Sequence, residues 1–282
     1  MIDLHIHTTM SDGQLTPSEV VRLASSIGVS TMAIADHDTV DGVEEGSAMA
    51  QSMGIGFISG IEISVKGNEE LHILGYCVDI QNGGLKKACE QFLFYRKERV
   101  QRIIDYLKEK RIEISAEQVL KNAVNGQVGR PHFARALLDS GHIQNIREAY
   151  DLYLATPEFN KIERPKPDFS EGISMIRNAG GVAVLAHPSK LKLDNDALVR
   201  LLNELVSAGL KGIEAYYSTH TKEQTDFYLS LAKEHDLIVT AGSDYHGEKA
   251  SPEVMIGTGI NNSLRYDNAN IIRELLEVAK SD

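Results

Sequence analysis

The sequence predicts an α/β fold in which a parallel sheet of seven or eight strands closes into a barrel that carries a helical insertion. Short apolar runs alternate with amphipathic segments of helical length over most of the chain. The chain has 282 residues, of which 42% are hydrophobic, so it can bury the core of one large domain. The alternation is interrupted once, between residues 85 and 167.

The first element is a strand, because every second residue over 2–6 is apolar. Side chains alternate between the two faces of a strand, so His5 and His7 point the same way. The segment TPSE at 16–19 follows, and it is a capping box with proline at the first helical position. It predicts a helix that Gly28 can end.

The remaining barrel elements follow in order along the chain. We expect strands at residues 31–35, 56–63, 71–78, 182–186, 212–216 and 238–241, with a short strand near 255–260. We expect helices at residues 42–53, 170–179, 196–208, 222–235 and from about 269. Because strands that alternate with helices build parallel sheets, we expect these strands to run parallel.

Residues 85–167 break the pattern and predict a helical insertion at one edge of the barrel. We expect helices at 85–110, 116–123, 131–140 and 146–154, followed by a linker with proline and lysine at 156–167. The predicted division is a barrel of residues 1–84 and 168–282 and an insertion subdomain of residues 85–167. The basic residues of 95–111 are interleaved with acidic ones around an apolar stripe, which predicts a solvated amphipathic helix.

Composition and charge narrow the class of function. The net charge of −11 opposes a broad electrostatic grip on duplex DNA. No apolar run approaches the roughly 20 residues of a membrane helix, and the N-terminus is polar, so we expect a cytoplasmic monomer that binds no membrane. Cys77 and Cys89 cannot form a disulfide framework or a four-thiolate zinc site, so any metal would bind nitrogen and oxygen.

Side chains that commonly bind metals stand at or just after most of the predicted strands. The nine are His5, His7, Asp12, His37, Glu62, His72, His187, Asp244 and His246. In parallel α/β barrels the carboxyl ends of the strands meet on one face, so we expect these side chains to converge. A single histidine at a strand end is usually a packed residue, but six of the ten histidines lie at such ends.

Burying so many imidazoles and carboxylates together would leave costly unpaired polar groups unless cations bound them. Imidazole and carboxylate together suit Mn²⁺, Zn²⁺ or Fe²⁺. A structural zinc site needs four ligands and would recruit thiolates, whereas nine nitrogen and oxygen ligands fit two or three ions with open positions. We therefore expect two or three divalent metal ions, manganese first, with zinc or iron as the alternatives.

These residues occur in short motifs that resemble the PHP family, named for polymerase and histidinol phosphatase domains. The motifs are HxH at 5–7, DHD at 36–38, GIEIS at 60–64, LHILGY at 71–76, AHP at 186–188 and SDYH at 243–246. The resemblance implies a distorted seven-stranded barrel that holds three divalent ions. It implies one ion at His5, His7, Glu62 and Asp244, a second at Glu62, His72 and His187, and a third at Asp12, His37 and His246.

Two further stretches resemble one subgroup, the nucleoside 3',5'-bisphosphate phosphatases and the related short-RNA 5'-exonuclease. They are GRPHFARALLD at 129–139 and GIEAYYSTHT at 212–221. The resemblance favours phosphate contact by Arg130 and His132, where the alternative is a surface loop before a proline-started helix. Lys161, Ser189 and His220 are further candidates for substrate contact, and the alternative for them is ordinary solvated surface.

The expected chemistry is hydrolysis by a metal-held hydroxide, because no GxSxG elbow, P-loop or catalytic-cysteine motif is apparent. Metal coordination lowers the pKa of water from about 15.7 towards 7. The expected substrates are a nucleoside 3',5'-bisphosphate, which would lose its 3'-phosphate, and short single-stranded RNA, trimmed from 5' to 3'. Two alternatives remain open: a phosphatase for another small metabolite such as histidinol phosphate, and a metal-stabilised module without activity.

Overall fold

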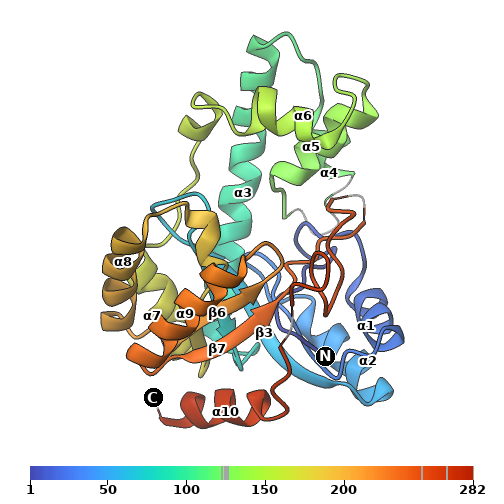
Figure 1. Cartoon of the computed structure of the whole chain (residues 1–282). Helices are drawn as coiled ribbons and strands as arrows, with labels where there is room; N and C mark the ends of the chain where they lie inside the picture. Colours follow the sequence, from blue (N-terminus) through green and yellow to red (C-terminus); the bar gives the residue numbers. More distant parts are fainter. Residues whose placement is uncertain (122, 124–126, 249, 265, 282) are drawn as a thin grey trace.

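The strands form one sheet in the order β1-β2-β3-β4-β5-β6-β7. The computed structural model describes residues 1–121, 123, 127–248, 250–264 and 266–281 (Figure 1). The strands are β1 (Ile2–Asp3), β2 (Thr31–Ile34), β3 (Gly56–Ser64), β4 (His72–Tyr76), β5 (Val182–Leu185), β6 (Gly212–Tyr217) and β7 (Ile238–Gly242). The backbone N–H of Leu4 donates to the carbonyl of Ala241 (2.9 Å), so the two ends of the sheet also meet. The predicted α/β barrel of seven strands is confirmed, and it is nearly closed.

One strand runs against the expectation of a parallel sheet. β4 pairs antiparallel with β3 and with β5, whereas the other neighbouring pairs are parallel. The reason lies in the connection, because residues 65–71 between β3 and β4 are too few for the crossover that parallel neighbours need. The reversal matters for the site: His72, the first residue of β4, pairs with Ser64 at the carboxyl end of β3.

Helices cover the outside of the barrel, with α1 and α2 on one side, α7 to α9 on the other and α10 across the end (Figure 1). They are α1 (Pro17–Ser26), α2 (Val43–Met53), α7 (Phe169–Asn178), α8 (Asn195–Ser207), α9 (Lys222–Glu234) and α10 (Ile271–Ser281). The capping box of Thr16 and Glu19 starts α1 as predicted. Gly54, in the left-handed conformation with φ of 70°, ends α2.

Two predicted strands are shorter or absent. β1 contains only Ile2–Asp3, and the rest of the predicted strand at 2–6 makes a single bridge between Ile6 and Tyr245. The strand expected near 255–260 is wrong, because this segment forms turns with one bridge between Met255 and Gly259. The glycines at 257 and 259 have φ of 75° and 66°, which a strand cannot accommodate.

The insertion is helical, as predicted. Its elements are α3 (Gly83–Glu109), α4 (Ala116–Leu120), α5 (Arg130–Asp139), α6 (Ile146–Ala149), a π-helix at Tyr150–Leu154 and a 3₁₀ turn at Phe159–Lys161. α3 rises from the barrel and carries α4, α5 and α6 beyond one end of the sheet (Figure 1). The helix expected at 116–123 ends at residue 120, and its residue 122 lies outside the described part of the chain.

The long helix α3 takes part in two hydrophobic cores. Near its start, Leu85 and Phe92 pack with the barrel residues of β3, β4, α7 and α8. Further along, Val100 and Leu107 pack in a separate cluster formed by α3, α4, α5 and the segments that follow. None of the helices in the described residues has the length and apolarity needed to cross a membrane. α3 therefore links the barrel to a helical unit that has its own core.

Candidate metal centre

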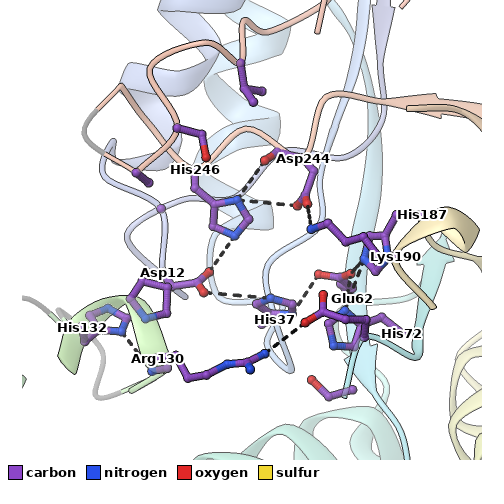
Figure 2. Close-up of a pocket in the computed structure, with 18 of the residues that line it drawn as sticks. Asp12, His37, Glu62, His72, Arg130, His132, His187, Lys190, Asp244 and His246 are labelled. Atoms are coloured by element: carbon purple, nitrogen blue, oxygen red, sulfur yellow. Dashed lines mark hydrogen bonds and ion pairs between the residues drawn. The ribbon is translucent and has the colours of Figure 1, made fainter. Parts of the chain in front are cut away.

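The structure brings all nine of the predicted metal-binding side chains to one rim of the barrel. Figure 2 shows the seven of them that line the cavity: Asp12, His37, Glu62, His72, His187, Asp244 and His246. Each belongs to at least one of four groups whose nitrogen and oxygen atoms lie within 4.8 Å of one another. The groups are His7, Asp12, His37 and His246; His5, His7 and Asp244; His5, Glu62 and His187; and His37, Glu62 and His72. The rim is formed by the carboxyl ends of the parallel strands and by the start of the reversed strand β4.

Glu62, near the end of β3, lies at the middle of this cluster and is fully buried. Its Oε2 atom lies 3.4 Å from His5 Nε2, 3.3 Å from His7 Nε2 and 2.8 Å from His37 Nδ1. Its Oε1 atom lies 2.9 Å from both His72 Nδ1 and His187 Nε2. One carboxylate therefore faces five imidazoles, and carboxylate and imidazole are ligands that suit divalent ions such as Zn²⁺ and Mn²⁺.

Two aspartates complete the cluster on either side of the histidines. Asp244 Oδ1 lies 3.1 Å from His7 Nε2 and 3.5 Å from His5 Nε2. Asp12 Oδ1 lies 3.2 Å from His246 Nε2, and Asp12 Oδ2 lies 4.0 Å from His37 Nε2 (Figure 2). The nine residues implied by the resemblance lie in one cluster, but its groups divide them differently: His187 lies with His5 and Glu62, and His72 lies with His37 and Glu62. His7 also adjoins the Asp12 group.

Polar atoms without a hydrogen bond inside the cluster test whether cations fit it. Among the described residues, thirteen buried side-chain nitrogen and oxygen atoms make no hydrogen bond, and six of them belong to the cluster: His5 Nε2, His7 Nε2, Asp12 Oδ1, His37 Nδ1, Glu62 Oε2 and His187 Nδ1. Several of the six lie at ion-pair distance from a neighbour without making a hydrogen bond. A buried polar atom left without a hydrogen bond costs about 1–3 kcal/mol. The six atoms are imidazole nitrogens and carboxylate oxygens, a donor set that suits Mn²⁺, Fe²⁺ or Zn²⁺. The residues therefore fit divalent metal ions.

The charges in the cluster are mutually stabilised despite burial. Burial alone would raise the pKa of Glu62, but the neighbouring rings of His37 and His72 hold it well below its usual range. Burial likewise opposes ionisation of Asp12, whereas His246 and His37 keep its pKa well below the usual value. Burial lowers the pKa of His187 to about 4, so this ring is neutral at physiological pH and can act as a ligand.

Glu214 on β6 orients two of the candidate ligands from outside the cluster. Its Oε1 lies 3.0 Å from His5 Nδ1, and its Oε2 accepts the backbone N–H of His187 at 2.7 Å. A carboxylate on one ring nitrogen directs the other nitrogen toward the metal. Sequence reasoning did not single out Glu214, although it lies in the GIEAYY stretch and alternates with apolar residues of a strand.

The three side chains of the DHD motif have three different tasks. His37 enters the cluster, while Asp36 accepts hydrogen bonds from the backbone N–H (2.7 Å) and hydroxyl (2.6 Å) of Thr8. Asp38 faces the insertion and pairs with Arg96 of α3 and with Arg164, whose Nη2 lies 2.6 Å from its Oδ2. The motif thus fixes the loop after β1, supplies one candidate ligand and attaches the insertion to the barrel.

A cavity of about 770 Å³ opens over the cluster and is lined by residues of both the barrel and the insertion. Seven cationic side chains line it, six of them in ion pairs with carboxylates: Arg96, Arg99, Arg130, Arg135, Arg164, Lys166 and Lys190. Arg130, at the start of α5, lies 3.2 Å from Glu70 (Figure 2). Lys190 Nζ lies 2.7 Å from Asp244 Oδ2, which also accepts the hydroxyl of Tyr217 at 2.8 Å. The cavity therefore brings together the nine candidate metal ligands, here called the metal-type cluster, and the cationic lining residues, here called the basic wall.

The residues expected to contact substrate separate into two sets. Arg130 and His132 line the cavity, and the backbone N–H of Gly129 donates to His132 Nδ1 at 3.0 Å. The structure does not bring the other three there. Lys161 is exposed on its 3₁₀ turn, Ser189 lines a separate hollow, and His220 is buried with Nδ1 2.9 Å from the carbonyl of Ala215.

Most of the basic wall was not predicted. The segment 95–111 was expected to be a solvated helix, yet Arg96 is only 8% exposed because it pairs with Asp38. Arg164 and Lys166 lie in the expected linker, where their charges suggested nothing beyond solvation. Lys190 lies two residues after the AHP motif. Its position shortly after a predicted strand was the signal in the sequence that it could reach the site.

Comparison with known proteins agrees with this geometry. The family model of the PHP domain matches residues 3–281. The 3',5'-nucleoside bisphosphate phosphatase of Chromobacterium violaceum is 31% identical over 247 residues, which cover 87% of each chain. The 5'-3' exoribonuclease of Haemophilus influenzae is 33% identical over 245 residues, which cover 86% of this chain and 89% of that one.

A further relative and a solved structure point the same way. The phosphoribosyl 1,2-cyclic phosphate 1,2-diphosphodiesterase of Eggerthella lenta is 30% identical over 251 residues, 87% of this chain and 94% of that one. A protein from Bifidobacterium adolescentis, predicted to be a metal-dependent phosphoesterase, superimposes with a TM-score of 0.86 at 30% identity, covering 98% of this chain and 96% of that one. The chain therefore belongs to the PHP domain family and is a metal-dependent phosphoesterase, in which nine candidate ligands converge beside the cavity.

Proposed function

We propose that the protein hydrolyses the 3'-phosphate of nucleoside 3',5'-bisphosphates. The observation that carries the proposal is the juxtaposition, in one cavity, of the metal-type cluster and a separate basic wall that includes Arg130. A substrate with two phosphates matches two anion-attracting regions, one for the phosphate that is removed and one for the phosphate that is kept. The named activity of the Chromobacterium violaceum relative supports the same substrate class.

We further propose that the cluster holds two or three divalent ions, manganese first, with zinc or iron as alternatives. His5, His7, Glu62 and Asp244 would hold one, Glu62, His72 and His187 a second, and Asp12, His37 and His246 a third, because the side chains within each set lie 2.9–4.0 Å from a neighbour of that set. Such ions lower the pKa of bound water and neutralise phosphoryl oxygens. The six buried atoms of the cluster that make no hydrogen bond support this assignment.

The chain's own residues bind and orient the substrate around that centre. Arg130 would hold the retained 5'-phosphate, because its guanidinium lines the cavity. Its ion pair with Glu70, at 3.2 Å, is partly exposed. His132, 5% exposed beside it, lines the same wall and fixes the start of α5 through Gly129. Tyr217 and Lys190 hold Asp244 Oδ2 at 2.8 and 2.7 Å, which leaves Oδ1 directed at His5 and His7.

A second activity, stepwise 5' to 3' trimming of short single-stranded RNA, is supported by the name of the Haemophilus influenzae relative. The cavity volume of about 770 Å³ lies high in the usual range for small-molecule sites, so it offers space beyond one mononucleotide. The same cleavage would release the 5'-terminal residue as a 5'-nucleotide, and the phosphate would stay on the new 5' end of the shortened RNA instead of being released. We also propose that the protein acts as a cytoplasmic monomer and leaves duplex DNA and membranes unbound, which the net charge of −11 supports for DNA.

The first test is product identity. Purified protein with Mn²⁺ should release phosphate and 5'-AMP from adenosine 3',5'-bisphosphate, and His37→Ala should abolish turnover while exposed His142→Ala does not. Equal turnover by His37→Ala would reject the assigned centre. Release of the 3'-nucleotide would reverse the proposed orientation. Turnover of histidinol phosphate alone would favour a different metabolite, and no turnover of any phosphoester would favour a metal-stabilised module.

The second test separates binding of the retained phosphate from chemistry. Arg130→Ala should raise the KM for adenosine 3',5'-bisphosphate at least about tenfold, because a charge-assisted contact to phosphate is lost. Turnover of an aryl phosphate, which has one phosphate, should change much less. Arg147→Ala is the matched control, because its side chain is 89% exposed on α6. A uniform loss on both substrates would remove Arg130 from recognition of the second phosphate.

A further inference from the structure

Tyr150 is a cavity residue to which the proposed chemistry gives no task. It begins the π-helix Tyr150–Leu154, in which the backbone N–H of Ala155 donates to the Tyr150 carbonyl at 3.1 Å. This widened turn directly continues α6, where a regular helix was expected. π-Helical turns are rare and occur frequently at functional sites. Here the turn places a tyrosine on the cavity wall.

The surroundings of Tyr150 combine an apolar surface with nearby charges. Pro131 and Ile146 line the same cavity from the insertion, so Tyr150 does not stand alone as an apolar group. Burial raises the pKa of Tyr150 to about 12, and the charges of Arg130 and Asp12 also act on its phenol. The ring is thus buried enough to stay neutral, and it lies within electrostatic range of both the basic wall and the metal-type cluster.

The other tyrosine on the cavity wall is already occupied. Among the described lining residues the tyrosines are Tyr150 and Tyr217. Tyr217 is 4% exposed, donates its hydroxyl to Asp244 and packs against the rings of His187 and His220. Tyr150 is partly exposed and lines the cavity. Of the two tyrosines, Tyr150 is therefore the one whose ring is available to a ligand.

We propose that Tyr150 is the stacking platform for the nucleobase of the substrate and makes the enzyme select nucleotides over sugar phosphates that lack a base. The inference rests on the proposed function, because a base can reach Tyr150 only if a nucleoside phosphate occupies the cavity. Stacking on an aromatic ring tolerates every base, since each base has a π-face. Adenosine, guanosine, cytidine and uridine substrates are therefore all accepted.

A base-free ligand is the informative comparison. The Eggerthella lenta relative is named for a phosphoribosyl cyclic phosphate, a substrate without a nucleobase. A stacking residue is one way in which a shared phosphoesterase barrel can discriminate between such substrates, because loss of stacking costs affinity only for ligands that carry a base. Tyr150 would then determine specificity without touching the phosphate that is cleaved.

The experiment measures binding and not turnover. Isothermal titration of the Mn²⁺-loaded protein compares 5'-AMP with ribose 5-phosphate, which share the 5'-phosphate and differ by the base. The wild type should bind 5'-AMP at least about fivefold more tightly. Tyr150→Leu should abolish that preference, whereas Tyr150→Phe should retain it. Tyr153→Leu, from the same π-helix but outside the cavity lining, should also retain it.

Two outcomes would overturn the inference: equal affinity of the wild type for the two ligands, or an undiminished preference in folded Tyr150→Leu. The first measurement needs no variant, so misfolding of Tyr150→Leu cannot hide a failure. The result is also separable from the proposed function. If the wild type hydrolyses bisphosphates but shows no preference for 5'-AMP, only the role of Tyr150 fails. If 5'-AMP binds through Tyr150 but no bisphosphate is hydrolysed, only the proposed reaction fails.

Discussion

Three residues at the rim of the barrel have backbones in the left-handed region. They are Asp38, His187 and Asp244, with φ of 58°, 27° and 57°. Such conformations cost about 1–3 kcal/mol for residues other than glycine and persist only where the surrounding structure enforces them. His187 and Asp244 are candidate ligands, and Asp38 directly follows the candidate ligand His37. The strain occurs where the chain must leave its strand direction to turn side chains into the centre or toward the insertion.

Glu214 supports a prediction at this scale. Glu214→Gln should weaken Mn²⁺ binding by about 10- to 100-fold, because an amide orients the His5 ring less strongly than a carboxylate does. Isothermal titration with Mn²⁺ measures the change, and circular dichroism checks that the fold is kept. Glu204→Gln, at an exposed position of α8, is the matched control and should bind Mn²⁺ like the wild type. Unchanged affinity in Glu214→Gln would show that Glu214 has no part in orienting the ligands.

The cysteines support a second prediction. Burial raises the pKa of Cys77 to about 11 and is the main cause that raises the pKa of Cys89 to about 12. A raised thiol pKa leaves less thiolate at any pH below it, so iodoacetamide at pH 8 should react about a hundredfold more slowly than with a free thiol. Mass spectrometry of the native and urea-unfolded protein measures both rates. Rapid alkylation of the native protein would contradict the buried environment.

At the scale of elements, the attachment of the insertion depends on one buried charge. Asp38 follows β2, while Arg96 lies on α3 and Arg164 on the segment that returns from the insertion. Burial alone would raise the pKa of Asp38, but Arg164 and Arg96 hold it well below its usual value. The ionised carboxylate therefore stabilises the fold above its unfolded pKa of about 3.9, and this contribution is lost as the pH falls toward the folded pKa.

Asp38→Asn should therefore destabilise the protein by about 3–5 kcal/mol at pH 7, because two buried guanidinium groups lose their counter-ion. Urea unfolding measures the difference from the wild type. The gap between the two proteins should shrink in titrations taken below about pH 4, where Asp38 takes up a proton in the unfolded wild type while the folded pair is still charged. Asp168→Asn is a suitable control, since the Asp168–Lys66 pair is exposed on both sides. A gap that stays constant with pH would contradict the role of the charge.

Elements also show what the sequence could and could not predict. The candidate ligands were found because all except His72, which begins β4, lie at the end of a recognisable apolar strand or after it, and the Thr16 and Glu19 cap predicted α1. The direction of β4 was missed. Apolar alternation does not indicate which way a strand runs, and only the short connection at 65–71 indicated the reversal. The pairing of Asp38 with Arg96 and Arg164 was missed because their sequence separations, 58 and 126 residues, leave no local pattern.

On the scale of the whole molecule, metal binding and stability are linked. A ligand that binds only the folded state at 100 times its Kd stabilises by about 2.7 kcal/mol. For a chain of this size that corresponds to a rise in Tm of about 5–10 °C. Mn²⁺ added to chelator-treated protein should therefore raise Tm in differential scanning fluorimetry, with Ca²⁺ as the comparison because it prefers oxygen ligands. A Tm that ignores Mn²⁺ would argue against the centre.

The two cores joined by α3 correspond to two proposed roles: the barrel would carry out the reaction, and the helical unit would recognise the substrate. The nine candidate ligands come from the barrel, whereas Arg130 and Tyr150 come from the helical unit above it. In a chimera, an insertion grafted from another phosphoesterase onto this barrel would change which substrate the protein accepts and would leave the candidate metal centre unchanged. The junction cannot be placed at the foot of α3, because Leu85 and Phe92 are part of the barrel's own interior. The grafted segment should therefore begin after Phe92, and it must contain an arginine that can pair with Asp38.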